Sequence, residues 1–120
     1  MKRLNRSIGF ALDGIQSCFR QEPNFKIHVV FAVLVIGAGI FFKIANIEWI
    51  VIIICIGAVL AAELMNTAIE ELCNIVQKQE HPVIKFIKDV SAAAVLIVAI
   101  ASAICGAFIF IPKILSIINQ

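Results

Sequence analysis

The sequence predicts an all-α membrane protein, in which an N-terminal amphipathic helix on the membrane surface precedes three transmembrane helices. Of its 120 residues, 62% are hydrophobic and 15% are charged, and the mean hydropathy is +1.03. A soluble chain of this size carries about a quarter charged residues and could not bury so much apolar surface in one core. The apolar residues also gather in three long stretches, each sufficient to cross a bilayer. We therefore treat residues 1–120 as a single membrane domain.

The N-terminal segment, residues 3–21, has apolar side chains at helical spacing, and most of its charged side chains fall on the other face. This pattern is typical of a helix that lies on a membrane surface. A helix packed against the transmembrane bundle would show the same pattern. Pro23 and Asn24 interrupt it, so we expect a turn over residues 21–24.

Three predicted spans follow the surface helix. The first covers residues 27–45, and the second covers residues 49–76, with Trp49 as an interfacial anchor at its start. A polar connector precedes the third span, residues 86–111, whose uncharged stretch runs from Val90 to Ile111. We expect Pro112, with Lys113, to mark its exit.

The basic residues are distributed unequally between the two sides of the predicted bundle. Only Lys43 lies between the first two spans, whereas the N-terminal segment and the second connector are basic through Lys2, Arg3, Arg6, Arg20, Lys26, Lys78, Lys85 and Lys88. Because cytoplasmic loops carry an excess of Lys and Arg, we expect a multi-pass membrane protein with a defined orientation. Its N-terminus and second connector would lie in the cytoplasm, where ATP is available.

The four cysteines stand far apart and form no Cys-x-x-Cys pair, so neither a zinc site nor a disulfide framework is predicted. We expect these thiols to behave as small hydrophobic groups. No pattern points to a nucleic-acid partner.

Polar residues interrupt the second span at Glu63, Asn66 and Glu70, whose spacing of i, i+3 and i+7 places them on one face of a helix. A charged carboxylate at the centre of a bilayer costs about 2.5–3.5 kcal/mol, so such a face needs a polar partner. Phosphoryl transfer would supply one, because magnesium takes carboxylate and phosphate oxygens and a further carboxylate can accept the proton of the acceptor hydroxyl. The alternative is a pair of acids that contact Lys or Arg for stability alone.

The segment Glu63-Leu64-Met65-Asn66-Thr67-Ala68-Ile69-Glu70 resembles the Glu-x-x-Asn-[Ser/Thr]-Ala-Ile-Glu signature of prokaryotic diacylglycerol kinases. Two further segments are similar to that family in the same order. They are residues 19–28, FRQEPNFKIH, which include Glu22, and residues 88–97, which begin with Lys88 and Asp89. The resemblance covers nearly the whole chain and implies a homotrimer with sites shared between subunits.

When the roles known for the family are assigned to the matching positions, the resemblance implies that Glu63 is the general base and that Glu22 and Glu70 bind Mg²⁺. Asn66 would orient groups beside the base. Lys88 and Asp89 would bind the nucleotide: a Lys suits phosphate oxygens, and an Asp can hold a ribose hydroxyl or its neighbouring Lys. For Lys88, a membrane anchor that reaches the headgroups is an alternative. Further positions matched to the nucleotide site are Gln79, Glu80, His81 and Phe10.

Two positions depart from the family pattern. Phe10 stands where many relatives have Tyr, so a hydroxyl contact is absent, and Asn74 stands where Asp is common, which removes a negative charge from the edge of the site. Neither lies in the signature itself.

The resemblance therefore implies an ATP-dependent kinase of a membrane lipid alcohol, either diacylglycerol or undecaprenol. The short chain and the Ile47-Glu48-Trp49 start of the second span look more like members that act on undecaprenol. A small proton-coupled transporter is the main alternative, but it would need an acid near midplane that both faces can reach. Here the polar residues converge on one side. A membrane scaffold, a third possibility, predicts no magnesium-dependent ATP turnover.

Overall fold

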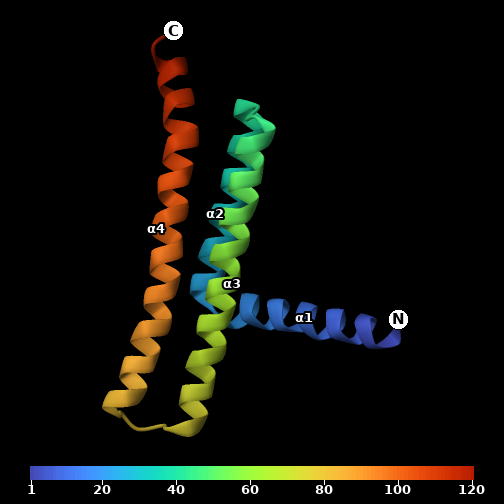
Figure 1. The fold of residues 1–120 in the computed structure, drawn as a ribbon, viewed down its shortest axis with the longest axis vertical. Coiled ribbons are helices and arrows are strands. Elements are labelled where there is room, and N and C mark those ends of the chain that lie inside the picture. Colours follow the sequence, from blue (N-terminus) through green and yellow to red (C-terminus); the bar gives the residue numbers. More distant parts are fainter.

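The structure, a computed structural model, describes residues 1–120 and is built only of helices. These are α1 (Lys2–Gln21), α2 (Pro23–Phe42), α3 (Asn46–Val76) and α4 (Pro82–Ile118). Helices α2, α3 and α4 run along one direction, and α1 leaves them at a steep angle (Figure 1). Each of the three is long and apolar enough to cross a membrane. The predicted all-α fold with three long apolar helices is therefore confirmed.

The break between α1 and α2 is a single residue. Glu22 has extended backbone, with φ −108° and ψ 109°, and α2 begins at Pro23. The predicted turn over residues 21–24 was therefore too long. Proline is well suited to the first turn of a helix, where its missing N–H leaves no hydrogen bond unmade. The short break places Glu22 at the corner where α1 meets the other helices (Figure 1).

The connection from α2 to α3 is also short, and α2 ends earlier than predicted. Lys43 closes α2 with left-handed backbone, φ 51°, and the Ala45 N–H donates to Glu48 Oε1 at 2.9 Å as α3 begins. Glu48 Oε2 accepts a second hydrogen bond from Lys113 Nζ on α4, at 2.8 Å. The hydrogen bond from Lys113, with that from Ala45, lowers the pKa of the Glu48 carboxyl, which precedes the predicted span. This pair ties the start of α3 to the late part of α4.

Helix α4 is longer at both ends than the predicted third span. It begins at Pro82, where His81 Nδ1 accepts from the Val83 N–H at 3.2 Å, and it continues past Pro112 to Ile118. The helix therefore extends beyond the predicted end of the third span. A proline removes one backbone hydrogen bond, and long helices of membrane proteins tolerate that loss when the rest of the turn is satisfied. Lys113 Nζ also donates to the Ile109 carbonyl at 3.2 Å beside this proline.

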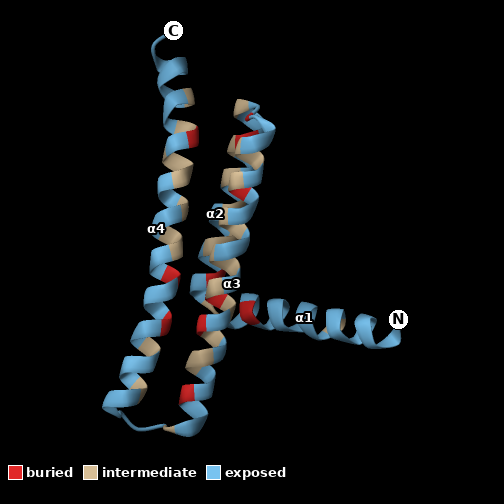
Figure 2. Cartoon of the chain, viewed as in Figure 1, coloured by how far each residue is buried: buried red, intermediate tan, exposed pale blue.

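The chain by itself buries very little of its apolar surface. Only 11 of the 120 residues are buried, and they appear as isolated patches on the helices (Figure 2). A small core of Ile44, Ile52 and Ile109 lies where the α2–α3 turn packs against α4. At the other end of α2, Phe25 is 2% exposed. Because so many large apolar side chains remain uncovered, the fold requires lipid or further protein around it.

Candidate active site

The polar face predicted on the second span is present on α3. Glu63 is 3% exposed and Asn66 is 7% exposed, so both lie inside the protein rather than toward its surroundings. Asn66 Nδ2 donates to Glu70 Oε1 at 3.3 Å, one helical turn farther along. The structure therefore brings together the three polar residues of the signature. Burial of a carboxylate and an amide is costly unless they have polar partners, which marks this face as functional.

Helix α2 contributes a residue to this cluster that the sequence analysis did not select. His28 Nε2 lies 3.8 Å from Glu63 Oε2, and the His28 side chain is 23% exposed. The carboxylates of Glu70 and Glu22 are also near enough to act electrostatically on Glu63. The sequence offered one signal for His28, which is a histidine at the start of an otherwise apolar span. Its partner Glu63, however, lies 35 residues away in the chain. Only the packing of α2 against α3 reveals the pair.

The predicted metal ligands, Glu22 and Glu70, approach the cluster from different elements. Glu22 stands at the α1–α2 corner, Glu70 stands on α3, and both are half-buried. The buried Asn66 Oδ1 has no hydrogen-bond partner, so a further oxygen is available beside them. These hard oxygen donors fit Mg²⁺, which is usually held by one or two carboxylates together with substrate phosphates. No group of three His, Cys, Asp or Glu side chains forms a self-sufficient metal cage in the chain.

Helix α1 is held against the site through a cysteine. Cys18 is 6% exposed, and its Sγ lies 3.7 Å from Thr67 Oγ1, the residue after Asn66 on α3. This contact brings the C-terminal part of α1, and with it Glu22, toward the polar face. All four cysteines are free, and Cys18 and Cys73 are buried.

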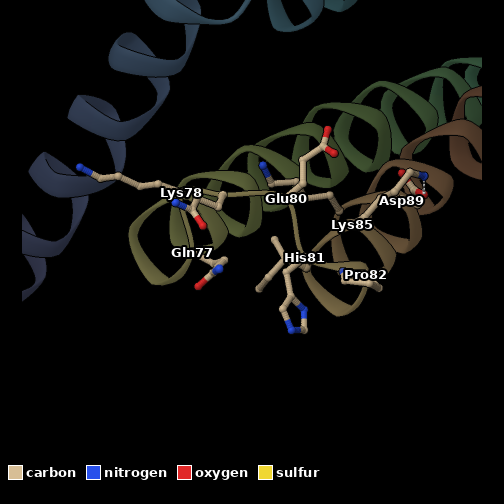
Figure 3. Close-up of a pocket in the computed structure, with 10 residues that line it drawn as sticks. Gln77, Lys78, Glu80, His81, Pro82, Lys85 and Asp89 are labelled. Atoms are coloured by element: carbon tan, nitrogen blue, oxygen red, sulfur yellow. Dashed lines mark hydrogen bonds and ion pairs between the residues drawn. The ribbon is translucent and has the colours of Figure 1, made fainter.

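The predicted nucleotide residues gather at the connector between α3 and α4, around an open cavity of about 600 Å³. Five of the six positions line it, together with Gln77, Lys78, Pro82, Ile84 and Lys85; the five are Gln79, Glu80, His81, Lys88 and Asp89. Glu80 and His81 extend to opposite sides of the connector (Figure 3). Because a helix rises about 1.5 Å per residue, this cavity begins roughly 10 Å along α3 beyond Glu70. The polar face of α3 and the charged cavity at the α3–α4 connector are thus two distinct features that lie next to each other along α3.

The two charged residues of the predicted nucleotide pair have different partners. Lys88 Nζ donates to Asn74 Oδ1 on α3 at 2.7 Å, whereas Asp89 forms an ion pair with Lys85 (Figure 3). The possibility that Asp89 holds its neighbour Lys88 was therefore wrong. Residues four apart meet on one side of a helix and adjacent residues do not. The hydrogen bond from Lys85 to Asp89, outside the apolar part of α4, raises the pKa of the lysine.

Phe10 is apart from the other predicted site residues. Its side chain is 68% exposed on α1, and it does not line the cavity at the connector. The chain itself therefore does not bring Phe10 together with Lys88 and Asp89. Lys85 is the reverse case: it lines the cavity and holds Asp89, and its position four residues before Asp89 could have indicated it.

Comparison with known proteins places this arrangement in a family. The family model described as prokaryotic diacylglycerol kinase matches residues 9–110, which include the α3 signature and the connector. The chain belongs to the prokaryotic diacylglycerol kinase family. The match includes Phe10, Glu22 and Asp89, and so spans all of the site positions named above.

Several curated relatives support the same family. The chain is 37% identical over 114 residues to the undecaprenol kinase of Bacillus subtilis, covering 95% of this chain and 93% of that protein. It is 34% identical to the diacylglycerol kinase of Synechocystis, over 92% of this chain and 64% of that protein. It is 33% identical to the diacylglycerol kinase of Pseudomonas aeruginosa, over 78% of this chain and 76% of that protein. The prediction of a lipid kinase is confirmed, and none of these relatives is named a transporter.

Proposed function

We propose that this protein transfers the γ-phosphate of ATP to the hydroxyl of a membrane lipid alcohol. The observation that carries the proposal is the buried polar face of α3, where Glu63 and Asn66 are almost fully enclosed and Asn66 donates to Glu70. Burial of a carboxylate inside an apolar bundle is costly. A role as the base that accepts the proton of a lipid hydroxyl would explain why it is buried there. The family and the named activities of the relatives support the same reaction class.

In this proposal Glu63 is the general base. It takes the hydroxyl proton as the lipid oxygen bonds to the γ-phosphorus; the bond from that phosphorus to the β,γ-bridging oxygen breaks, and ADP leaves with the bridging oxygen. Glu22 and Glu70 would hold Mg²⁺, which neutralises charge on the phosphate oxygens. Asn66, whose Oδ1 is free of other partners, would orient a reacting group beside the base.

The nucleotide is proposed to occupy the cavity at the α3–α4 connector. Lys88 is suited to contact phosphate oxygens, because its hydrogen bond to the neutral Asn74 leaves its charge uncompensated within the chain. Asp89, with Gln79, Glu80 and His81, would contact the rest of the nucleotide. Phe10 could join this set only through another subunit or a movement of α1.

The orientation and assembly follow from the same proposal. The basic N-terminal segment and the basic connector would both face the cytoplasm, with α1 on the membrane surface and α2, α3 and α4 across it. A homotrimer would cover helix faces that the single chain leaves exposed, and it would bring residues of neighbouring subunits to one site.

For the lipid substrate, we propose undecaprenol in preference to diacylglycerol. The support is the match to the undecaprenol kinase of Bacillus subtilis over nearly the full length of both chains. Both lipids present a primary hydroxyl at the membrane surface, so the same base and metal site would serve either one.

The reaction is tested with purified protein in lipid bilayers, Mg²⁺ and ATP labelled at the γ-phosphate. We expect label in undecaprenyl phosphate, with less or none in phosphatidic acid when diacylglycerol is supplied. Glu63→Gln should lower kcat by at least about 100-fold, since general-base catalysis contributes roughly 10²–10⁴. Glu71→Gln, a change at an exposed position of the same helix, is the control and should stay within twofold of the parent. Full activity of Glu63→Gln would contradict the assigned base, and absence of label from every lipid would contradict the function.

A further inference from the structure

The pairing of His28 with Glu63 is not explained by the roles given so far. His28 is on α2 and Glu63 is on α3, and the two side chains approach to 3.8 Å, with the carboxylate side chain only 3% exposed. This separation is longer than a hydrogen bond but within the range of an ion pair. The imidazole is thus placed beside the carboxylate that the proposed reaction uses as its base.

Glu63 has no other cationic partner in the chain. The ion pairs of the protein are His28 with Glu63, Lys85 with Asp89, and Lys113 with Glu48. The remaining charged groups that act on Glu63 are Glu70, from α3, and Glu22, from the α1–α2 corner, and both are acidic. His28 is therefore the only basic side chain that the folded chain pairs with the enclosed Glu63 carboxylate.

We propose that His28, through the positive charge that an imidazole can carry, is a positioning residue that holds the carboxylate of the base Glu63 in place for proton transfer. The inference rests on the proposed function, because it assigns His28 a role through the base. During the reaction the lipid hydroxyl gives its proton to Glu63 Oε, and His28 exchanges no proton. His28 therefore contacts neither the nucleotide nor the transferred phosphate.

A role through charge predicts an order among substitutions that a packing role does not. His28→Gln retains a polar side chain of similar size but cannot carry a charge, whereas His28→Lys is always a cation at neutral pH. We expect His28→Gln to lower kcat about tenfold or more, with KM for Mg·ATP and for the lipid within twofold of the parent. His28→Lys should recover a substantial part of the lost kcat. Lys26→Gln, which removes a cation from the same helix, is the matched control and should leave kcat within twofold.

A double-mutant comparison tests whether His28 acts through Glu63. The loss caused by His28→Gln should be large in the parent and should vanish when Glu63→Gln is already present, because the charge being held is then absent. The measurements are initial rates of labelled lipid formation by proteins matched for folded fraction in the same bilayers.

The outcomes separate this inference from the proposed function. If the parent protein phosphorylates lipid and His28→Gln keeps its kcat, or if His28→Lys is no more active than His28→Gln, the role of His28 is overturned while the kinase stands. A further loss from His28→Gln in the Glu63→Gln protein would also overturn it. If the parent itself transfers no phosphate, the proposed function fails first.

Discussion

At the scale of single residues, Gly39 decides how closely α2 can approach the start of α3. A Cβ atom at this position would lie 2.7 Å from Trp49 Cη2 and 3.1 Å from Ile44 Cδ1, so neighbours on two sides would have to move. Gly37, half a turn earlier on the same helix, would meet nothing within 4 Å. Gly39 and Gly37 therefore form a matched pair of positions for measuring how much this close contact matters for stability.

We expect Gly39→Ala to lower the free energy of unfolding by about 1–3 kcal/mol, the usual cost of overpacking a tight contact. Gly37→Ala should be neutral or stabilising by roughly 0.5–1 kcal/mol, because alanine favours helix over glycine. Denaturant titration of both variants in detergent micelles, followed by Trp49 fluorescence, measures the difference. Equal stability of the two variants would contradict the close packing of Gly39 on Trp49.

The site also shows what residue patterns can and cannot reveal. Glu63, Asn66 and Glu70 were predictable because their spacing repeats on one helix, and helical geometry alone places them together. His28 has no such relation to Glu63 along the chain. Asp89, predicted to bind the nucleotide, lines the connector cavity, and its partner Lys85 lies four residues earlier on the same helix.

At the scale of the elements, the pair of Glu48 and Lys113 joins the start of α3 to α4. It lowers the pKa of Glu48 in the folded protein below the ordinary value of 4.5. A carboxyl with a lowered folded pKa stabilises the fold fully above its unfolded pKa, and this stabilisation is lost as the pH falls through the folded value.

We therefore expect Glu48→Gln to unfold at a lower temperature than the parent at pH 7, with the difference shrinking below about pH 4.5. Thermal unfolding in detergent, recorded by circular dichroism from pH 3 to pH 7, follows the difference. Glu71→Gln, at an exposed carboxylate without an ion pair, should show no such pH-dependent gap. A gap that stays constant down to pH 3 would argue against the pair.

The α3–α4 connector gives a prediction for nucleotide binding. Lys88→Met should raise KM for Mg·ATP about tenfold, because one charge-assisted contact to phosphate is lost, and it should leave KM for the lipid alcohol unchanged. The side chain retains its apolar length, so the helix itself should be preserved. Steady-state rates with each substrate varied in turn provide the measurement. An unchanged KM for ATP would favour the alternative of a headgroup anchor.

At the scale of the whole molecule, a single chain leaves the three long helices mostly uncovered. Large apolar residues such as Phe41, Phe108 and Ile118 are more than two-thirds exposed, and Phe10 does not line the cavity at the connector. Lipid can cover apolar faces, but it cannot complete a polar site. This is the physical reason to expect that neighbouring subunits contribute to each site.

We expect the protein in detergent to have three times the mass of one chain by native mass spectrometry. If sites are shared, mixed assemblies of Glu63→Gln and Lys88→Met subunits should be more active at subsaturating ATP than either variant alone, because some sites then contain both native residues, each from a different subunit. A monomer that is fully active in bilayers would contradict the shared site.

Apolar content and helical spacing act locally along the chain, so the fold class, the number of long apolar helices and the acidic face of α3 could be predicted from the sequence. It did not determine where helices end: Pro23 begins a helix and Pro112 does not stop one, since both outcomes depend on which backbone groups find partners. The contact of His28 on α2 with Glu63 on α3 became evident only in the folded chain. Contacts between helices depend on their packing, which brings together residues that no repeat in the sequence relates.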